Sequence, residues 1–278
     1  MKKALKELKR KISRISKPKK LSDKVWADFV NNTTIVLMAG GESSRFSEVT
    51  NGSAVNKNAF LLPNGDTMIE MAIKMYKASG FVNFVASVFH NATSIEKVLG
   101  DGSRYGVNLK YSYDPEIPVG KGGAIKNAIQ NGSIPKNHYC IIHNPDDVIV
   151  DFDGSFPKHI ISGHNHSQIN KALATVVIVE ETPYTYTGMK IVDNVVHQIE
   201  MYPAIPIPTH IGVTILSPQI YPYFDKHFDL GKKADFESVL FPILAKKKLL
   251  GAVSIPSHCW IAVNNAKTYK QLVKRLEK

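Results

Sequence analysis

Apolar runs and amphipathic stretches alternate along the first half of the chain. Four short apolar runs predict buried strands, at 35–38, 82–89, 109–113 and 139–143. Three stretches with apolar residues at helical spacing lie between them, at 67–79, 94–99 and 122–130. This alternation predicts an α/β fold whose doubly wound, mostly parallel sheet is built with right-handed crossovers.

The pattern becomes mixed after about residue 150. Further strands are expected at 172–180, 211–216 and 250–255, and further helices near Tyr221, over 236–247 and from Ala266. The apolar runs 189–192 and 195–199 flank Asp193-Asn194, which predicts a hairpin lying over the sheet. The histidines of 163–167 are interpreted as part of a polar loop and not as a metal site.

Length and composition narrow the class of protein. With 278 residues and 44% hydrophobic content, the chain can bury a large core, and we expect one compact main domain. Cys140 and Cys259 lie far apart in apolar runs, which indicates reduced core thiols and favours the cytoplasm. Since no run of eighteen apolar residues and no signal-peptide core is found, we expect a soluble, cytoplasmic protein.

The net charge of +11 is concentrated at the N-terminus. Residues 1–24 hold eleven lysines and arginines but two acidic residues, so +9 of the charge lies there. Leu5, Leu8, Ile12 and Ile15 fall on one face of a helix that should end at 16–18. We therefore divide the chain into a basic amphipathic appendage, 1–31, and a domain, 32–278. A solvated appendage with one packed stripe, a membrane surface, RNA and a partner subunit all remain open for residues 1–24.

The run 35–38 leads directly into a glycine-rich segment, Ala39-Gly40-Gly41-Glu42-Ser43-Ser44-Arg45. Without Cβ atoms in the way, backbone N–H groups at Gly40 and Gly41 can approach a triphosphate, and Arg45 adds a fixed planar charge. An ordinary glycine turn would explain the glycines alone. The arginine and the motifs that follow favour the phosphate site.

A second glycine-rich segment, Gly120-Lys121-Gly122-Gly123-Ala124, opens the predicted helix at 122–130. Glycines at a helix N-terminus can form an anion site or allow a flat ring to approach closely. A tight helix start is the alternative explanation.

Two adjacent carboxylates, Asp146 and Asp147, follow the apolar run 139–143. They are expected at the carboxyl edge of the sheet, where open α/β sheets bind ligands. Oxygen ligands at this edge suit Mg²⁺, which also bridges phosphates. A turn-capping pair is the alternative.

With Lys57, these motifs complete a resemblance to a known family. The segment 57–70 reads Lys-x-x-x-Leu-x-Pro-x-Gly-x-Thr-Met-Ile-Glu, and after Ala-Gly-Gly-x-Ser-x-Arg it resembles the front of the NDP-sugar pyrophosphorylases, which are sugar-1-phosphate nucleotidyltransferases. The resemblance runs in order from about residue 34 to 272. It implies a Rossmann-like sheet of the GT-A-like type, with a nucleotide-binding half at about 32–150 and a mixed, sugar-phosphate-binding half at 151–278.

The resemblance also implies roles for individual residues. Arg45 and Lys57 would contact the triphosphate as the catalytic cations. The nucleotide would be held by residues of the two glycine-rich segments, namely Ala39, Gly40, Gly41, Glu42, Ser43, Gly120, Gly122 and Gly123. Asn56 stands where the family usually has proline.

A Mg²⁺ cofactor with two protein ligands is implied as well. Asp147 aligns with the metal-binding aspartate of the family, and Asp146 replaces a glycine. Val263-Asn264-Asn265 resembles a segment of the N-acetylglucosamine-1-phosphate uridylyltransferases, which makes Asn264 the second ligand. A helix N-cap explains either asparagine about as well.

The acceptor side departs from the family pattern. Sugar-phosphate contacts are expected from Gly188 and Glu200, but Met201 stands where the family has lysine, so Lys190 or Lys121 would have to compensate. His210 and Ala262 are further departures.

The expected partners are a nucleoside triphosphate and a sugar 1-phosphate, with no nucleic acid; an oligomer remains open. Pyrophosphate would leave after in-line attack on the α-phosphorus. A non-sugar phosphorylated acceptor, or a nucleotide-sugar-binding regulator without turnover, are the alternatives.

Overall fold

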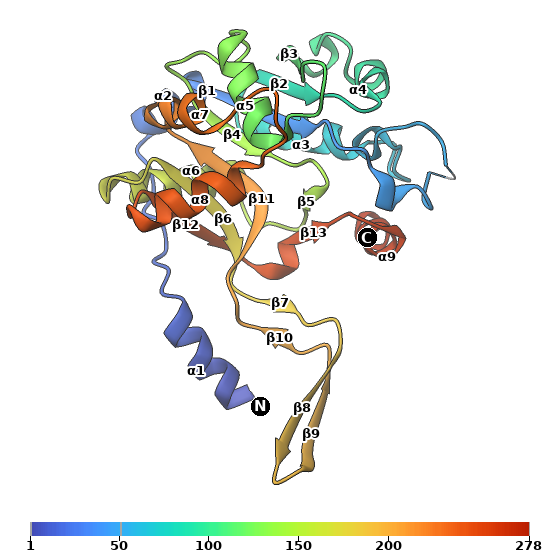
Figure 1. The fold of residues 1–278 in the computed structure, drawn as a ribbon, viewed down its shortest axis with the longest axis vertical. Helices are drawn as coiled ribbons and strands as arrows, with labels where there is room; N and C mark the ends of the chain where they lie inside the picture. Colours follow the sequence, from blue (N-terminus) through green and yellow to red (C-terminus); the bar gives the residue numbers. More distant parts are fainter. Residues whose placement is uncertain (1, 51, 278) are drawn as a thin grey trace.

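The computed structural model describes residues 2–50 and 52–277, and its centre is a seven-stranded sheet (Figure 1). The strands follow in the order β12 (Leu250–Ile255), β6 (Ala174–Val179), β11 (Thr209–Leu216), β4 (Tyr139–His143), β1 (Thr33–Ala39), β2 (Asn83–Val88) and β3 (Asn108–Tyr113). β11 runs antiparallel to both neighbours, and the other pairs are parallel. The predicted fold class, a mostly parallel doubly wound sheet with a mixed second half, is confirmed.

Helices cover both faces of this sheet. One face carries α2 (Asp23–Asn31), α3 (Met68–Lys77), α4 (Ala92–Leu99) and α6 (Phe156–Ile169), and the other carries α5 (Gly120–Gln130), α7 (Tyr221–His227) and α8 (Phe236–Lys246). Side chains of the central strand β1 point alternately to the two faces of the sheet and pack in a hydrophobic cluster on each face. Ile35 and Leu37 belong to one cluster and Val36 to the other. Each face of the sheet is therefore a hydrophobic core, which explains why the parallel strands read as apolar runs.

Local sequence fixes where these helices begin. Thr67 and Glu70 form a capping box at the start of α3, so the helix begins one residue after the threonine. The short 3-10 turns η1 (Ser44–Phe46), η2 (Lys57–Ala59), η3 (Ser103–Tyr105), η4 (Pro218–Ile220) and η5 (Ser257–Cys259) connect the longer elements.

Residues 163–167 are helical, so the prediction of a polar loop there is wrong. They lie in α6, where His164 is fully buried and bonds to Thr175 Oγ1 (2.9 Å) and Ser217 Oγ (3.1 Å). Gly163 lies so close to β12 that an added Cβ would be 2.5 Å from Val253 Cβ. The small and polar residues that suggested a loop are those that let α6 pack closely on the sheet.

The predicted hairpin exists, but it does not lie over the sheet. β8 (Thr187–Val192) and β9 (Val195–Met201) pair with each other, and β7 (Thr182–Pro183) pairs with β10 (Ala204–Ile205) between this hairpin and the body of the molecule. Together residues 182–207 form an arm that extends from the body of the molecule (Figure 1). Asp193 and Asn194 have φ values of 48° and 63°, as a two-residue hairpin turn requires.

The N-terminal segment contains two helices. α1 (Lys2–Ile12) ends earlier than predicted, so Ile15 lies beyond it, and α2 begins after the N-cap Ser22. Phe29 of α2 is 3% exposed and packs in the main core. The described helices include none that is long and apolar enough to span a bilayer.

A small second layer joins the end of the chain to the middle. β5 (Asp147–Ile149) pairs antiparallel with β13 (Trp260–Ala262), which places Ala262 opposite Asp147. The last helix, α9 (Ala266–Leu276), follows and closes a third hydrophobic cluster with Phe46.

Candidate functional site

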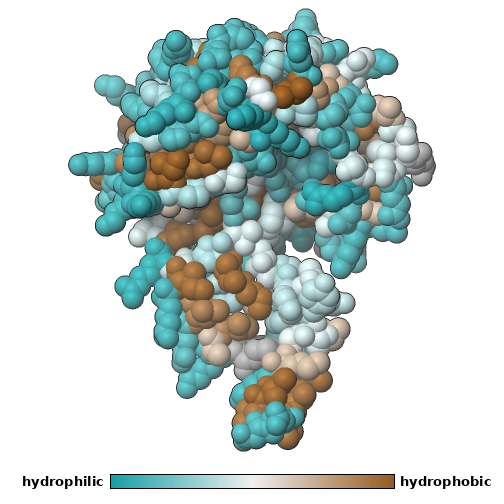
Figure 2. All heavy atoms as spheres, viewed as in Figure 1, coloured by the Kyte–Doolittle hydropathy of each residue, from teal (hydrophilic) through white to brown (hydrophobic). Residues whose placement is uncertain are grey.

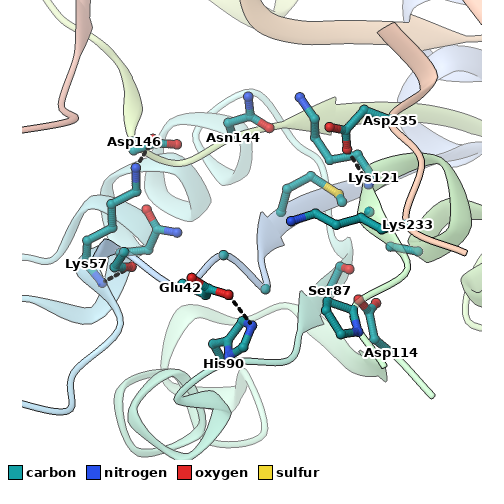
Figure 3. Close-up of a pocket in the computed structure, with 18 residues that line it drawn as sticks. Glu42, Lys57, Ser87, His90, Asp114, Lys121, Asn144, Asp146, Lys233 and Asp235 are labelled. Carbon is teal, nitrogen blue, oxygen red and sulfur yellow. Dashed lines mark hydrogen bonds and ion pairs between the residues drawn. The ribbon is translucent and has the colours of Figure 1, made fainter. Parts of the chain in front are cut away.

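The cleft lies where the strand order of the sheet reverses. β1 is followed along the chain by β2 and β3 on one side, and β4 lies on its other side. The carboxyl ends of β1 and β4 therefore diverge and leave a crevice, the place where open α/β sheets bind ligands. A cavity of about 260 Å³ opens there, and Figure 3 shows its lining.

The first glycine-rich segment, residues 39–45, forms one wall of this cleft and is held rigidly. Ser43 has a left-handed φ of 60°, and its Oγ accepts a hydrogen bond from Lys57 N (3.1 Å). The amide of Asn56 donates to Ala39 O (2.7 Å) and His90 O (3.2 Å). Asn56, which departs from the family pattern, thus ties the end of β1 to the next loop. An added Cβ on Gly41 would meet nothing within 4 Å, so its backbone is open toward a ligand.

The ammonium group of Lys57 lies between two oxygen acceptors. Its ammonium group forms an ion pair with the Asp146 carboxylate and donates to Asn264 Oδ1 at 3.1 Å. The helix cap is made by the neighbouring residue, because Asn265 Oδ1 accepts from Thr268 N (3.1 Å). The two asparagines therefore have separate roles: Asn265 caps α9, and Asn264 faces the cation.

The two aspartates after β4 also point in different directions. Asp146 lines the cleft, whereas Asp147 accepts hydrogen bonds from Trp260 Nε1 (2.9 Å) and Asn144 Nδ2 (3.1 Å). Burial, together with repulsion from Asp146, raises the pKa of Asp147 to about 7. Gly212 of β11 passes so near that any Cβ there would collide with this carboxylate.

A buried histidine fixes the turn that carries both aspartates. His143 ends β4, and its ring bonds to Tyr76 Oη (3.0 Å) and to Asp147 O (3.0 Å). Burial lowers the pKa of His143 to about 4, so the ring is neutral at physiological pH. This network orients the turn and takes no part in the cleft itself.

The second glycine-rich segment reaches the cleft at Gly120, Lys121 and Ala124, whereas its two inner glycines pack inside the protein. Gly120 and Lys121 line it, while Gly122 packs against Phe228 and an added Cβ on Gly123 would lie 2.5 Å from Val119 Cβ. Lys121 N donates to Asp235 Oδ1 (2.8 Å), and its ammonium group pairs with Glu237. Gly122 and Gly123 thus allow α5 to pack closely against Phe228 and Val119.

Arg45 and Lys233 line a hollow that adjoins the cleft, next to Lys57 and Asn264. Arg45 comes from η1, and Lys233 comes from the loop before α8, in the opposite half of the chain. In the part of the chain that is described, neither forms an ion pair with a carboxylate. Figure 3 shows Lys233 extending toward the middle of the cleft.

Several cleft residues were not foreseen from the sequence. They are Ser87, His90, Asp114, Lys233 and Asp235. His90 Nε2 lies 3.6 Å from the Glu42 carboxylate, and burial raises the pKa of Asp114. Ser87 is the last residue but one of strand β2, which ends at Val88, and each of the others follows a strand or precedes a helix; none has a motif around it. Their position one to three residues from a strand or helix end is the only signal that could have indicated them.

The predicted sugar-phosphate residues are not brought to the cleft, apart from Lys121. Gly188, Lys190 and Glu200 lie on the arm, where Gly188 and Glu200 face each other across the hairpin. His210 lies inside the bulge of β11, where Nε2 contacts Val213 O at 3.1 Å. Met201 is also on the arm and is 60% exposed.

Comparison with known proteins places this arrangement in a family. The chain is 21% identical over 253 residues to a UTP–glucose-1-phosphate uridylyltransferase of Synechocystis, covering 86% of this chain and 62% of the relative. It is 28% identical over 134 residues to an N-acetylmuramate α-1-phosphate uridylyltransferase of Neisseria meningitidis, covering 45% of this chain and 54% of the relative. The chain thus covers less than two thirds of the length of either relative.

Solved structures share the fold. A UDP-glucose pyrophosphorylase complexed with UDP-glucose superposes with a TM-score of 0.64 at 15% identity, covering 88% of this chain and 98% of that one. HddC from Yersinia pseudotuberculosis gives a TM-score of 0.62 at 20% identity, with 87% and 99% covered. The sequence model of the nucleotidyl transferases matches residues 34–233, and the chain belongs to that family.

Proposed function

We propose that the chain condenses a nucleoside triphosphate with a sugar 1-phosphate to give an NDP-sugar and pyrophosphate. The observation that carries this proposal is the set of three cations, Arg45, Lys57 and Lys233, beside an open glycine-rich wall at the switch point of the sheet. Three cations are suited to a polyphosphate. The relatives named for uridylyl transfer to glucose 1-phosphate and N-acetylmuramate 1-phosphate support a sugar phosphate as the acceptor.

The residues around Lys57 fit a magnesium ion. The Asp146 carboxylate and Asn264 Oδ1 already converge on a cation, the ammonium group of Lys57. One carboxylate and one amide oxygen match the few protein ligands that Mg²⁺ takes when phosphates supply the others. In this proposal Asp146 replaces Asp147 as the carboxylate ligand, because the oxygens of Asp147 accept hydrogen bonds from Trp260 and Asn144. When bound, the metal would neutralise phosphate charge and align the reacting groups.

The reaction needs charge neutralisation and positioning from the chain. An oxygen of the acceptor phosphate forms a bond to the α-phosphorus, and the bond from that phosphorus to the oxygen of the β-phosphate breaks. The nucleophile is already an anion, so no general base is required. Arg45, Lys57 and Lys233 would hold the charge that accumulates on the phosphates, and the backbone of Gly41 would approach them closely.

Met201 stands where the family has a lysine, and we propose that Lys233 supplies the positive charge of that lysine. Lys190 lies on the arm, and the ammonium group of Lys121 pairs with Glu237. Lys233 alone among these lysines extends into the cleft with no acidic partner among the described residues. Gly188 and Glu200 remain predicted sugar contacts, and they would reach the cleft only after a movement of the arm.

A panel assay tests the proposal. The full chain is incubated with Mg²⁺, each of the common nucleoside triphosphates and a series of sugar 1-phosphates, and pyrophosphate release is measured. Release that requires both substrates supports the proposal. Release with alditol or choline phosphates but with no sugar phosphate would assign a non-sugar acceptor, which the altered acceptor residues Met201 and His210 favour as the second candidate. Nucleotide-sugar binding without release would overturn both.

A further inference from the structure

One face of the arm's hairpin is largely apolar, and Thr187, which pairs with Met201, is the polar residue at its base. Its strand pairs place five apolar side chains on the same side: Met189, Ile191, Val196, Ile199 and Met201. Lys190, Gln198 and Glu200 lie on the opposite side, together with Val192 and Val195 next to the turn. The five apolar side chains are 46% to 63% exposed. A lone two-stranded hairpin is marginally stable in water, so this face needs a partner surface.

Helix α1 presents a second open apolar stripe within a strongly basic segment. Leu8 is 38% exposed and Ile12 is 47% exposed, so this stripe is not packed on the body of the protein. Lys9, Arg10 and Lys11 occupy the last turn of the helix, and residues 1–24 carry +9 of the net charge. The helix therefore combines an apolar stripe with positive charge on its other faces.

These two features lie at the same end of the molecule. In Figure 1, α1 and the hairpin both extend from one end of the longest axis, away from the sheet that carries the cleft. Lys9 Nζ lies 3.5 Å from Glu180 and 3.7 Å from Glu181, at the base of the arm, which holds the helix beside it. Figure 2 shows apolar surface on this end, over the arm and close to the hydrophilic basic helix.

We propose that this end of the molecule binds the surface of an anionic lipid bilayer. Positive charge attracts acidic headgroups, and the apolar stripe of α1 and the apolar face of the hairpin enter the boundary between headgroups and acyl chains. An anionic bilayer surface interacts with both the positive charge and the apolar side chains of this end, whereas the other candidate partners interact with one of the two. A second copy would bring a second cluster of positive charge to the same interface, and a nucleic acid would leave the apolar face in water.

Co-sedimentation with vesicles tests the proposal. The full chain is mixed with vesicles of phosphatidylcholine alone and with vesicles that also contain phosphatidylserine. We expect binding to the anionic vesicles to be at least about tenfold tighter and to weaken as salt shortens the range of the electrostatic attraction. Equal binding to both vesicles, or no binding to either, would overturn the proposal.

Three variants identify which residues are responsible. Lys3→Glu with Lys6→Glu and Arg10→Glu should abolish the preference for anionic vesicles. Ile191→Ser with Ile199→Ser should weaken binding to the anionic vesicles and leave the salt dependence of that binding unchanged. The matched control reverses three exposed lysines on the body, Lys97→Glu with Lys136→Glu and Lys246→Glu, and should bind within about twofold of the unaltered chain.

Folding of each variant is checked by circular dichroism, and the mass in solution is measured by light scattering. A doubled mass that the arm variant abolishes, without vesicle binding, would assign the apolar face to a second copy. Binding to an RNA oligonucleotide in preference to anionic vesicles would assign the basic helix to nucleic acid. Either result would overturn the membrane proposal, as would a control variant that loses vesicle binding to the same degree.

Discussion

Lys233 reaches the cleft from the half of the chain opposite to the glycine-rich wall. We expect Lys233→Ala to lower kcat/KM for pyrophosphate release by roughly two to three orders of magnitude, because one phosphate charge would be left without its cation. Lys121→Ala should cost less, since its ammonium group already pairs with Glu237. Steady-state kinetics with varied acceptor measure both effects.

Lys136→Ala, on an exposed surface, is the matched control and should leave the kinetics unchanged. A loss in Lys121→Ala that exceeds the loss in Lys233→Ala would return the anion-binding role to Lys121.

The orientation of the two aspartates gives a second prediction at this scale. Asp146→Asn should reduce turnover at saturating Mg²⁺ by at least about 100-fold, because it removes the only carboxylate that faces Lys57 and Asn264 among the described residues. Asp147→Asn should retain activity within about tenfold, because Asp147 contacts Trp260 and Asn144 and not the cation; the loss that we expect comes from the one oxygen replaced by NH2, which can no longer accept its hydrogen bond. Binding of Mn²⁺, followed by electron paramagnetic resonance, gives a readout that is separate from turnover.

The opposite ranking would assign the metal to Asp147, as the alignment with the family first indicated. Equal loss of Mn²⁺ binding in both variants would mean that the turn as a whole, and not one carboxylate, determines the site.

At the scale of the elements, strands that are buried on both faces were predictable from the sequence. The bounds of β4 agree with the apolar run 139–143, because a strand buried on both faces shows no alternation of polar residues. The bounds of the edge strand β12, which is only partly buried, also agree with the run 250–255. Two elements were predicted wrongly. The small residues of α6 resemble a loop unless their close packing on β12 is known. Polar and apolar residues alternate in the strands of the arm, as they do in a strand that covers a sheet. The sequence does not show that the apolar side chains of the arm are exposed to solvent.

The close contact of α6 with β12 can be tested directly. Gly163→Ala should lower the free energy of unfolding by about 1–3 kcal/mol, because the added methyl group meets Val253 Cβ at 2.5 Å. This cost exceeds the roughly 1 kcal/mol that alanine contributes to helix propensity. Urea denaturation followed by circular dichroism measures the difference.

Gly231→Ala is a suitable control, because its added Cβ would approach no atom closer than 3.4 Å. An unchanged or raised stability of Gly163→Ala would mean that α6 can move away from the sheet at little cost.

For the whole molecule, the glycine-rich wall of the cleft was easier to predict than the rest of its lining. Residues 39–45 and Lys57 belong to short, continuous motifs, and the structure brings them together. Lys233 and Asp114 reach the cleft through the fold, each from a loop with no motif around it. The predicted contacts Gly188 and Glu200 depend on where the arm lies, which is a tertiary property that local pattern does not determine.

Global stability should depend on pH through buried histidines, and His164 is the clearest case. Burial lowers its pKa to about 3, whereas an unfolded chain has a pKa near 6.5. The unfolded state therefore takes up a proton between these values that the folded state does not, so stability falls as pH decreases below about 6.5.

His164→Gln should make this decline shallower by up to about 1.4 kcal/mol per pH unit between about pH 6 and pH 4. Parallel urea titrations of both proteins across that range measure the slopes. Identical slopes would show that His164 is protonated in the folded protein as readily as in the unfolded chain.

The hydrogen bond from Lys57 to Asn264 has a consequence for how the protein is made. The two residues are 207 positions apart along the chain, and β13 must pair with β5 before Asn264 is in place. During synthesis the glycine-rich wall emerges early and can fold onto β1 with its neighbours. Its counterpart, Asn264, emerges 207 residues after Lys57. A nascent chain would therefore carry an incomplete cleft until β13 and α9 have emerged from the ribosome.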